Sequence, residues 1–248
     1  MKRSLPFVII GLVAVVALGA GALIYKSKRD LLASAPTPAP LASGKPGAKP
    51  PHVRGGANAP VTLEEFGDFQ CPPCAAIAHN LLRIEHDYGD RLRVIFRHLP
   101  LKTHNHAAQA AHVAEAAGLQ GRFWEMHDRL YREQAAWSKE ANVTPIFESY
   151  AADLKLDLPR FRKDVESEEV KARVRADQER AASINAISTP TLFLNGLLVP
   201  VSSFPAAKLR SAIDDLLNGK DPFPSPSPSS SPSPSPSPSP SPSPAPSP

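Results

Sequence analysis

Cys71 and Cys74 are the only cysteines of the chain, and two residues separate them. A strand-like run, residues 61–66, precedes the pair, and an apolar helical run, residues 75–88, comes after it. The pattern therefore places both thiols where a strand gives way to a helix. Two thiols at this spacing can close an intramolecular disulfide, so the sequence predicts thiol–disulfide exchange as the chemistry of this segment.

The two cysteines are expected to have different roles. Cys71 is predicted at the N-cap of the helix, where unpaired N–H groups and the helix dipole favour a thiolate over a thiol. The thiolate is the nucleophile in disulfide exchange, so Cys71 is the expected attacking residue. Cys74 lies one turn further along the same face, and we expect it to resolve a mixed disulfide formed at Cys71.

The dipeptide between the cysteines bears on how reactive Cys71 is. Pro72 suits the first helical position, but Pro72 and Pro73 carry no N–H to donate to the Cys71 sulfur. The helix dipole alone stabilises a thiolate by roughly 0.3–1 kcal/mol, or about 2 kcal/mol when the group is partly buried. The sequence thus predicts a moderately activated thiol, with a pKa no lower than about 5.

Two other uses of a cysteine pair are disfavoured. A zinc ion needs four ligands, and the other two would have to be histidines, from the set His98, His104, His106 and His112. A static structural disulfide across one helical turn closes a very small loop and gives little entropic stabilisation.

Composition limits the class of partner. The chain has 248 residues and a formal net charge of +4, with a pI near 9.1. Its positive charges are scattered and often stand beside acids, as in Arg132-Glu133. Such a distribution does not form the basic stripe of a nucleic-acid-binding surface, so we expect no nucleic-acid partner.

The N-terminal region predicts attachment to a membrane. Residues 5–24 form an apolar run without a charge, which is long enough to span a bilayer. We interpret residues 1–30 as an uncleaved signal anchor, with a cleaved signal peptide as the alternative. Charges that flank the run do not decide its orientation. Because anchors at the extreme N-terminus commonly export the domain attached to them, we expect a single-pass cell-membrane protein whose catalytic domain faces the periplasm or extracytoplasmic space.

Two further segments have the composition of linkers. Residues 31–59 are rich in Pro, Ala, Gly and Lys, and we predict a flexible tether that ends where structure begins, near residue 60. Residues 222–248 are largely Ser-Pro repeats, which predicts a disordered, polyproline-like tail. A core of about 160–170 residues remains, which is enough for one domain.

Residues 60–221 show the pattern of an α/β domain. The strands are expected to form one mixed sheet, in which the first two belong to a right-handed βαβ unit and Asn195-Gly196 makes a hairpin turn. A helical block, about residues 103–186, interrupts the sheet. The predicted strands are residues 61–69, 91–99, 188–194 and 197–201, and the flanking helices are residues 75–88 and 206–217.

Strand alternation assigns the acids near the cysteines to two faces. Glu65 shares the face of Cys71, whereas Glu64 and Asp68 point the other way. A carboxyl group buried under the cysteines would have a raised pKa and could accept the proton of Cys74. A solvent-facing or salt-bridged Glu65 is the alternative. Asp68 is predicted to cap the start of the helix, and His98 to be structural.

The motifs together resemble a known family. LEEFGDFQCPPC at residues 63–74, VIFRHLPLKTHNHAAQAA at 94–111 and STPTLFLNG at 188–196 are similar to segments of the DsbA-like thiol–disulfide oxidoreductases. The resemblance covers most of residues 61–196. It implies a thioredoxin fold with an inserted helical domain, and it makes Cys71 the exposed nucleophile and Cys74 the resolving thiol.

The resemblance also implies a substrate-binding site and partners. Thr189 and Pro190 would form the cis-proline pair that binds an extended substrate, and Glu65 would be the buried acid of the family. Cysteine-containing proteins would be the substrates, and a quinone-linked oxidase or a thiol donor in the membrane would be the redox partner. Exchange itself needs no metal or organic cofactor.

The sequence leaves the direction of exchange open. Pro72-Pro73 departs from the Pro-His dipeptide of the prototype oxidase, which argues against strong oxidising power. Oxidase, reductase and isomerase all remain compatible with the residues. A non-catalytic tethered binding module or holdase on the same scaffold is the alternative function.

Overall fold

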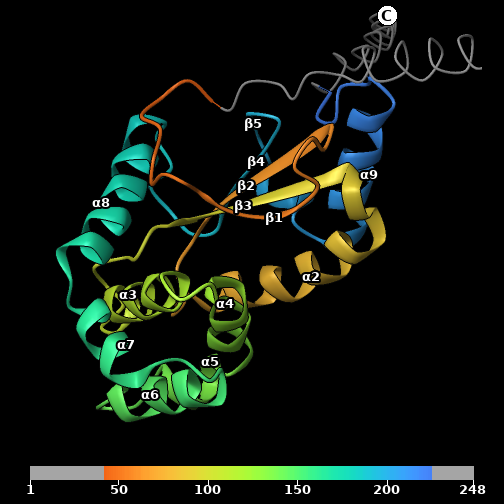
Figure 1. Ribbon diagram of the computed structural model, residues 1–248. Helices are drawn as coiled ribbons and strands as arrows, with labels where there is room; N and C mark the ends of the chain where they lie inside the picture. The colour runs from red at the N-terminus through yellow and green to blue at the C-terminus, as the bar shows by residue number, and fades with distance from the viewer. Residues whose placement is uncertain (1–41, 225–248) are drawn as a thin grey trace, which may run out of the picture.

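A five-stranded mixed sheet forms the centre of the domain (Figure 1) in the computed structural model, which describes residues 42–224. The strand order is β1-β3-β2-β4-β5, and only β2 and β3 are parallel. The strands are β1 (His52–Gly55), β2 (Val61–Gly67), β3 (Leu92–His98), β4 (Thr191–Leu194) and β5 (Leu197–Leu198).

The helices divide into a pair that flanks the sheet and a block inserted between β3 and β4. The flanking helices are α2 (Pro72–Tyr88) and α9 (Ala206–Leu217), with short 3-10 turns η1 (Gly89–Arg91) and η2 (Val201–Ser203). The inserted helices are α3 (Ala107–Gly118), α4 (Phe123–Arg132), α5 (Gln134–Trp137), α6 (Thr144–Asp153), α7 (Leu158–Val165) and α8 (Glu168–Ser183). The predicted insertion and βαβ unit are confirmed.

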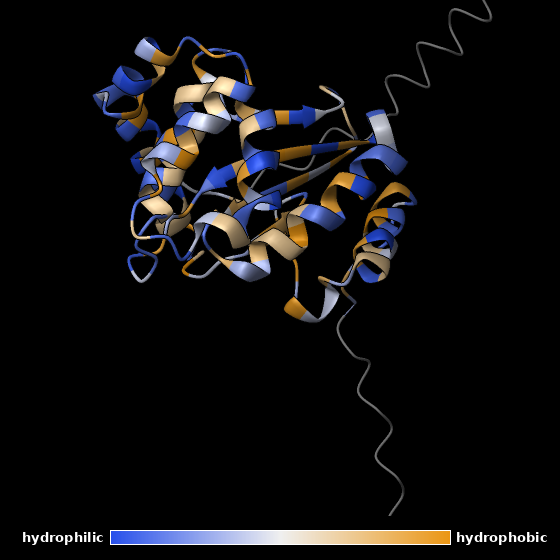
Figure 2. Cartoon of the chain, turned by 90° about the horizontal axis from the view of Figure 1, so that it is seen from below, coloured by the Kyte–Doolittle hydropathy of each residue, from blue (hydrophilic) through white to orange (hydrophobic). Residues whose placement is uncertain are grey.

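Every residue of β2 is buried, because both faces of the sheet are covered. Leu63 lies in an apolar cluster with residues of β3, α2 and α9. Phe66 packs on the other face against Ala181 of α8. The helices of the domain carry both hydrophilic and hydrophobic residues, as expected of helices that cover a core on one side (Figure 2).

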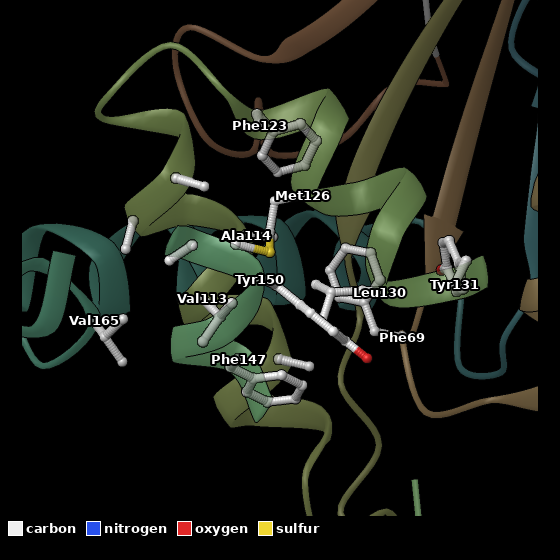
Figure 3. Close-up of a cluster of buried hydrophobic side chains, with 14 of the residues drawn as sticks. Phe69, Val113, Ala114, Phe123, Met126, Leu130, Tyr131, Phe147, Tyr150 and Val165 are labelled. Atoms are coloured by element: carbon white, nitrogen blue, oxygen red, sulfur yellow. The ribbon is translucent and has the colours of Figure 1, made fainter. Parts of the chain in front are cut away.

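A second core lies inside the helical insertion (Figure 3). Side chains from α3, α4 and α6, among them Val113, Leu130 and Phe147, converge there. Phe69, which lies just after β2, belongs to the same cluster as the two cysteines. The inserted helices are thus packed directly against the loop that carries the cysteine pair.

Several strand ends differ from the sequence prediction. β3 is shorter by one residue at each end, and β4 begins at Thr191, not at residue 188. β2 ends at Gly67, not at residue 69, because the chain turns there toward α2. β5 stops at Leu198 instead of continuing to residue 201. Pro200 has no N–H for a sheet ladder, and η2 begins directly after it. The hairpin turn is confirmed, with positive φ at both Asn195 and Gly196.

The prediction of a flexible linker over residues 31–59 is wrong for residues 42–59. β1 pairs antiparallel with β3 there, and Ala48 is buried. Buried side chains bind the backbone of this segment: Asp177 Oδ1 accepts from Ala48 N at 2.8 Å, and Arg180 Nη1 donates to the Lys45 carbonyl at 2.7 Å. Partners distant in sequence therefore order a segment whose composition alone favours a coil.

The predicted membrane anchor and the Ser-Pro tail lie at the two ends of the chain. The predicted anchor, residues 1–30, and the Ser-Pro tail from residue 225 lie outside the described residues. The predicted tail begins too early, because Phe223 packs against the cluster of α2 and α9. Over residues 42–224, no helix has both the length and the apolar character needed to cross a bilayer.

Candidate active site

The cysteine pair occupies the start of α2, as predicted. Cys71 is the N-cap residue, with φ −79° and ψ 117°, and Pro72 takes the first helical position. Both cysteines are free thiols and both are buried, so the expectation of an exposed Cys71 is wrong: its side chain belongs to the apolar cluster of the helical insertion. The Cys74 N–H donates to the Cys71 carbonyl at 3.1 Å, which closes the first turn and holds the two residues on one face.

The surroundings of Cys71 favour its thiolate. A hydrogen bond from the Cys74 thiol lowers the pKa of Cys71 from 9.0 to about 6, against the opposing effect of burial. A hydrogen bond from the Cys74 backbone also lowers it. The pKa is lower than the helix dipole alone would give, because the Cys74 thiol and backbone N–H both donate to the Cys71 sulfur.

Cys74 has the opposite character. It is fully buried, and its burial raises its pKa well above 9.0. The hydrogen bond that it shares with Cys71 and the nearby carboxyl of Glu65 raise the pKa further. Cys71 is thus the thiolate and Cys74 the thiol at neutral pH, so Cys74 must lose a proton to a base before it can attack.

The loop before β4 brings Thr189 and Pro190 against Cys71. The Thr189–Pro190 peptide bond is cis. The Cys71 sulfur lies 3.5 Å from the Thr189 carbonyl oxygen, to which its thiol form donates, although 118 residues separate the two in sequence. The two predicted substrate-binding residues therefore lie beside the predicted nucleophile.

Glu65 lies inside the domain beneath the pair. It is 1% exposed, and its Oε1 has no hydrogen-bond partner among the described residues. Burial and the nearby Glu85 raise the pKa of Glu65 to about 8, whereas Arg54 acts to lower it. The predicted burial of this acid is confirmed. A carboxyl with a pKa near neutral can both take a proton from Cys74 and return it.

Replacing Glu65 should change how stability depends on pH. Its pKa is about 8 in the folded chain against 4.5 for an ordinary glutamate, so stability falls as pH rises between these values. In Glu65→Gln this loss disappears. We expect the unfolding free energy of the variant to gain about 3 kcal/mol over that of the wild type between pH 4.5 and 7.

Urea unfolding at several pH values measures this gain. The exposed Glu179, which pairs with Lys45 at the surface, provides a matched Glu→Gln control that should behave like the wild type. A Glu65→Gln curve parallel to that of the wild type over the same pH range would show that Glu65 is ionised in the folded protein.

Two glutamines hold the cysteine loop, residues 68–71, in place, and neither was predicted to be part of the site. Gln134 of α5 donates through Nε2 to the carbonyls of Phe69 and Cys71, at 2.7 and 3.0 Å. Gln70 Nε2 donates to the Ser138 carbonyl at 2.8 Å. No local pattern marks these residues, because their partners come from the helical insertion.

Asp68 has a different role from the predicted one. It does not cap α2, since Cys71 is the N-cap. Its buried carboxylate accepts from the N–H groups of Gln70 and Leu101, at 2.7 and 2.9 Å. It also pairs with His104 Nδ1 at 2.7 Å. Asp68 thus joins the cysteine loop to the segment after β3.

Within the described part of the chain, the cysteines do not belong to a group of side chains that could bind a metal ion. Among residues 42–224, the group with suitable ligand atoms in reach of one another is His52, His98 and Glu115. Arg173 Nε donates to Glu115 Oε2 at 2.6 Å, so the charge of this carboxylate is already balanced by a guanidinium group. The predicted structural role of His98 agrees with its burial against Glu115 at 3.1 Å.

Comparison with known proteins places this site in a family. Residues 48–215 match the family model described as thioredoxin. The Na(+)/H(+) antiporter NhaA 1 of Mycolicibacterium gilvum is 41% identical over 150 residues, which are 58% of this chain and 23% of the antiporter. NhaA of Herminiimonas arsenicoxydans is 39% identical over 145 residues, 58% of this chain and 22% of that protein. The chain thus spans less than a quarter of the curated relatives it matches.

Solved structures share the fold. Oxidised BdbD from Bacillus subtilis has a TM-score of 0.62 and 26% identity, over 72% of this chain and 99% of BdbD. The thiol–disulfide exchange protein alpha-DsbA2 from Wolbachia pipientis has a TM-score of 0.58 and 18% identity, over 67% and 87% of the two chains. The chain therefore belongs to the thioredoxin family, and its fold is that of the DsbA-like thiol–disulfide oxidoreductases.

Proposed function

We propose that the protein is a thiol–disulfide oxidoreductase that acts on cysteines of protein substrates from a membrane-tethered position outside the cytoplasm. The observation that carries the proposal is the contrast between the two thiols. Surrounding groups lower the pKa of Cys71 to about 6 and raise that of Cys74. This is the division of roles that exchange needs, because one sulfur must attack and the other must wait as a thiol.

In the reducing direction, the Cys71 thiolate attacks a substrate disulfide. A mixed disulfide forms at Cys71, and the other substrate sulfur leaves as a thiolate. Glu65 then takes the proton of Cys74, and the Cys74 thiolate attacks the Cys71 sulfur. The products are the Cys71–Cys74 disulfide and a reduced substrate. The reverse steps oxidise a substrate dithiol and return the proton from Glu65 to Cys74.

The loop before β4 is suited to bind the substrate backbone. The carbonyl of Thr189 points to the Cys71 sulfur, so a peptide lying along this loop in extended form would bring its cysteine to the nucleophile. Ile187, two residues before Thr189, is 82% exposed. It offers an apolar contact beside the loop for such a peptide.

Two observations support the membrane tether. Residues 5–24 have the length and apolar character of a membrane-spanning helix. The relatives named as Na(+)/H(+) antiporters contain a domain similar to this one as about a fifth of their chain. In this chain, as in those relatives, the domain would lie beside a membrane. A membrane-bound redox partner could restore its oxidation state there.

A trapping experiment tests the proposed exchange. In Cys74→Ala the attack of Cys71 is kept and resolution is lost, so mixed disulfides with protein substrates should accumulate through Cys71. Non-reducing gels and mass spectrometry of the adducts measure this. Cys71→Ser in the same background should form none. If Cys74→Ala forms no adducts under mild oxidant, the non-catalytic binding module becomes the better account.

A further inference from the structure

A groove of about 490 Å³ lies between α2 and α4, next to the site. Ala75 and Ala78 of α2 line one side, and Asp128 and Tyr131 of α4 line the other. Glu65 reaches solvent by no direct path, since it is 1% exposed. Tyr131, which lines the groove, places its hydroxyl close to the strand that carries Glu65.

Tyr131 connects the groove to the face of the sheet that carries Glu65. Glu65 and Gly67 are two positions apart on β2, so they share that face. A Cβ at Gly67 would lie 2.7 Å from the Tyr131 hydroxyl, which shows how closely this hydroxyl approaches the strand. The hydroxyl is buried and has no hydrogen-bond partner among the described residues.

An ion cluster built by three elements lies on the same face of the sheet. Arg54 of β1 is in register with Val94 of β3, and Val94 with Leu63 of β2, which shares its face with Glu65. Arg54 of β1 pairs with Glu85 of α2, and its Nη1 donates to Asp128 Oδ2 of α4 at 2.8 Å. The Arg54 guanidinium also stacks over Trp124, 4.3 Å from the ring centre. The three charged side chains are only 10–23% exposed, so solvent screens their effect on Glu65 weakly.

Among residues 42–224, Arg54 is the cation that acts on Glu65. Its strand neighbours on β3 and β4 are Phe96 and Leu192, which are apolar. The titratable groups that the packed elements contribute, apart from the ion cluster, are Cys71 and Cys74 of the α2 start, His127 and Tyr131 of α4, and Asp68. Burial lowers the pKa of His127 to about 4, so its ring is neutral at pH 7.

We infer that Arg54 and Glu85 are positioning residues that control, with opposite signs, when Glu65 is free to take the proton of Cys74. The inference rests on the proposed exchange reaction. Arg54 stabilises an ionised Glu65, and Glu85 disfavours it. In the resolving step, one ionised Glu65 carboxylate accepts the proton of one Cys74 thiol. The rate of this step therefore depends on the fraction of Glu65 that is ionised, and the ion cluster sets the pH at which that fraction rises.

Dithiodipyridine separates the two steps in the full-length reduced chain. Attack by Cys71 forms a Cys71–pyridyl mixed disulfide and releases one thiopyridone. Attack by Cys74 then forms the Cys71–Cys74 disulfide and releases the second thiopyridone. The rate of the second release should rise with pH around a midpoint near the Glu65 pKa of about 8.

Variants of the ion pair should shift this midpoint in opposite directions. Glu85→Gln should move it toward acid and Arg54→Met toward alkali, each by about one pH unit. At pH 7 the second release would become about fivefold faster in Glu85→Gln, because a group with a midpoint of 7 is half ionised there, and about tenfold slower in Arg54→Met. Arg54→Lys, which keeps the charge, should restore the wild-type midpoint. The first release should keep its own pH profile in all three.

Arg122 and Glu125 form a matched ion pair at the surface of α4, with side chains 50% and 43% exposed. Arg122→Met and Glu125→Gln should leave both releases unchanged. If the Arg54 and Glu85 variants shift the midpoint in the same direction, or leave it in place, the pair is merely structural and the inference is wrong. If the wild-type chain shows no first release, the proposed exchange reaction itself fails.

Discussion

Replacing Cys71 by serine is expected to reduce thiol–disulfide exchange to the uncatalysed background. A serine hydroxyl neither ionises near neutral pH nor forms a bond to sulfur that exchange could break. The attacking thiolate of the wild-type chain has a pKa of about 6, so its rate of attack should rise with pH to about 6 and then level off. Dithiodipyridine release by the full-length chain measures both the loss and the profile.

Cys74→Ala is the matched control for this prediction, because it removes a thiol from the same helical turn and keeps the nucleophile. It should retain the first thiopyridone release and lose the second. Thermal unfolding of both variants checks that the fold survives. Exchange by Cys71→Ser at the wild-type rate would show that Cys74, with its raised pKa, attacks directly.

Removing the charge of Glu64 is expected to destabilise the fold by about 3–5 kcal/mol. Glu64 is fully buried on the opposite face from Glu65. Its carboxylate accepts two hydrogen bonds from Arg180, at 2.7 Å each, and one from Arg97 Nε at 2.9 Å. Without it, Asp177 is the one anion that pairs with either of these buried guanidinium groups among residues 42–224, and an unpaired buried charge is costly.

Urea unfolding of Glu64→Gln measures this effect. Glu179→Gln breaks an exposed pair, in which the Lys45 and Glu179 side chains are 61% and 59% exposed, and should leave stability close to that of the wild type. The Glu64→Gln substitution should also loosen residues 42–48, since Arg97 and Arg180 bind the backbone of that segment. A Glu64→Gln variant as stable as Glu179→Gln would mean that solvent reaches this pair.

The parts of the site that the sequence predicted correctly depend on local spacing. C-x-x-C after a strand determines that Cys71 is the N-cap, and strand alternation determines that Glu65 faces the pair. Thr189-Pro190 was assigned through the family resemblance, and the structure places it against Cys71. Each of these features can be recognised within a few residues of sequence.

The parts that the sequence did not predict depend on distant partners. Residues 42–59 have the composition of a linker, yet Arg97, Asp177 and Arg180 order them from β3 and α8. Arg54 stood inside that supposed linker, so its effect on Glu65 could not be seen before β1 was placed in the sheet. Likewise, Gln134 has no sequence signal, because its role exists only once α5 lies over the cysteine loop.

The reduction potential of the Cys71–Cys74 pair tests the central claim most directly. The full-length chain would be equilibrated in glutathione buffers, and its thiols read by alkylation mass shift. A Cys71 pKa of about 6 lies between those of thioredoxin and DsbA, so we expect one reversible two-electron transition between about −270 and −120 mV. If no reversible transition joins the two thiols, Cys71 and Cys74 are not a redox pair and the account is wrong.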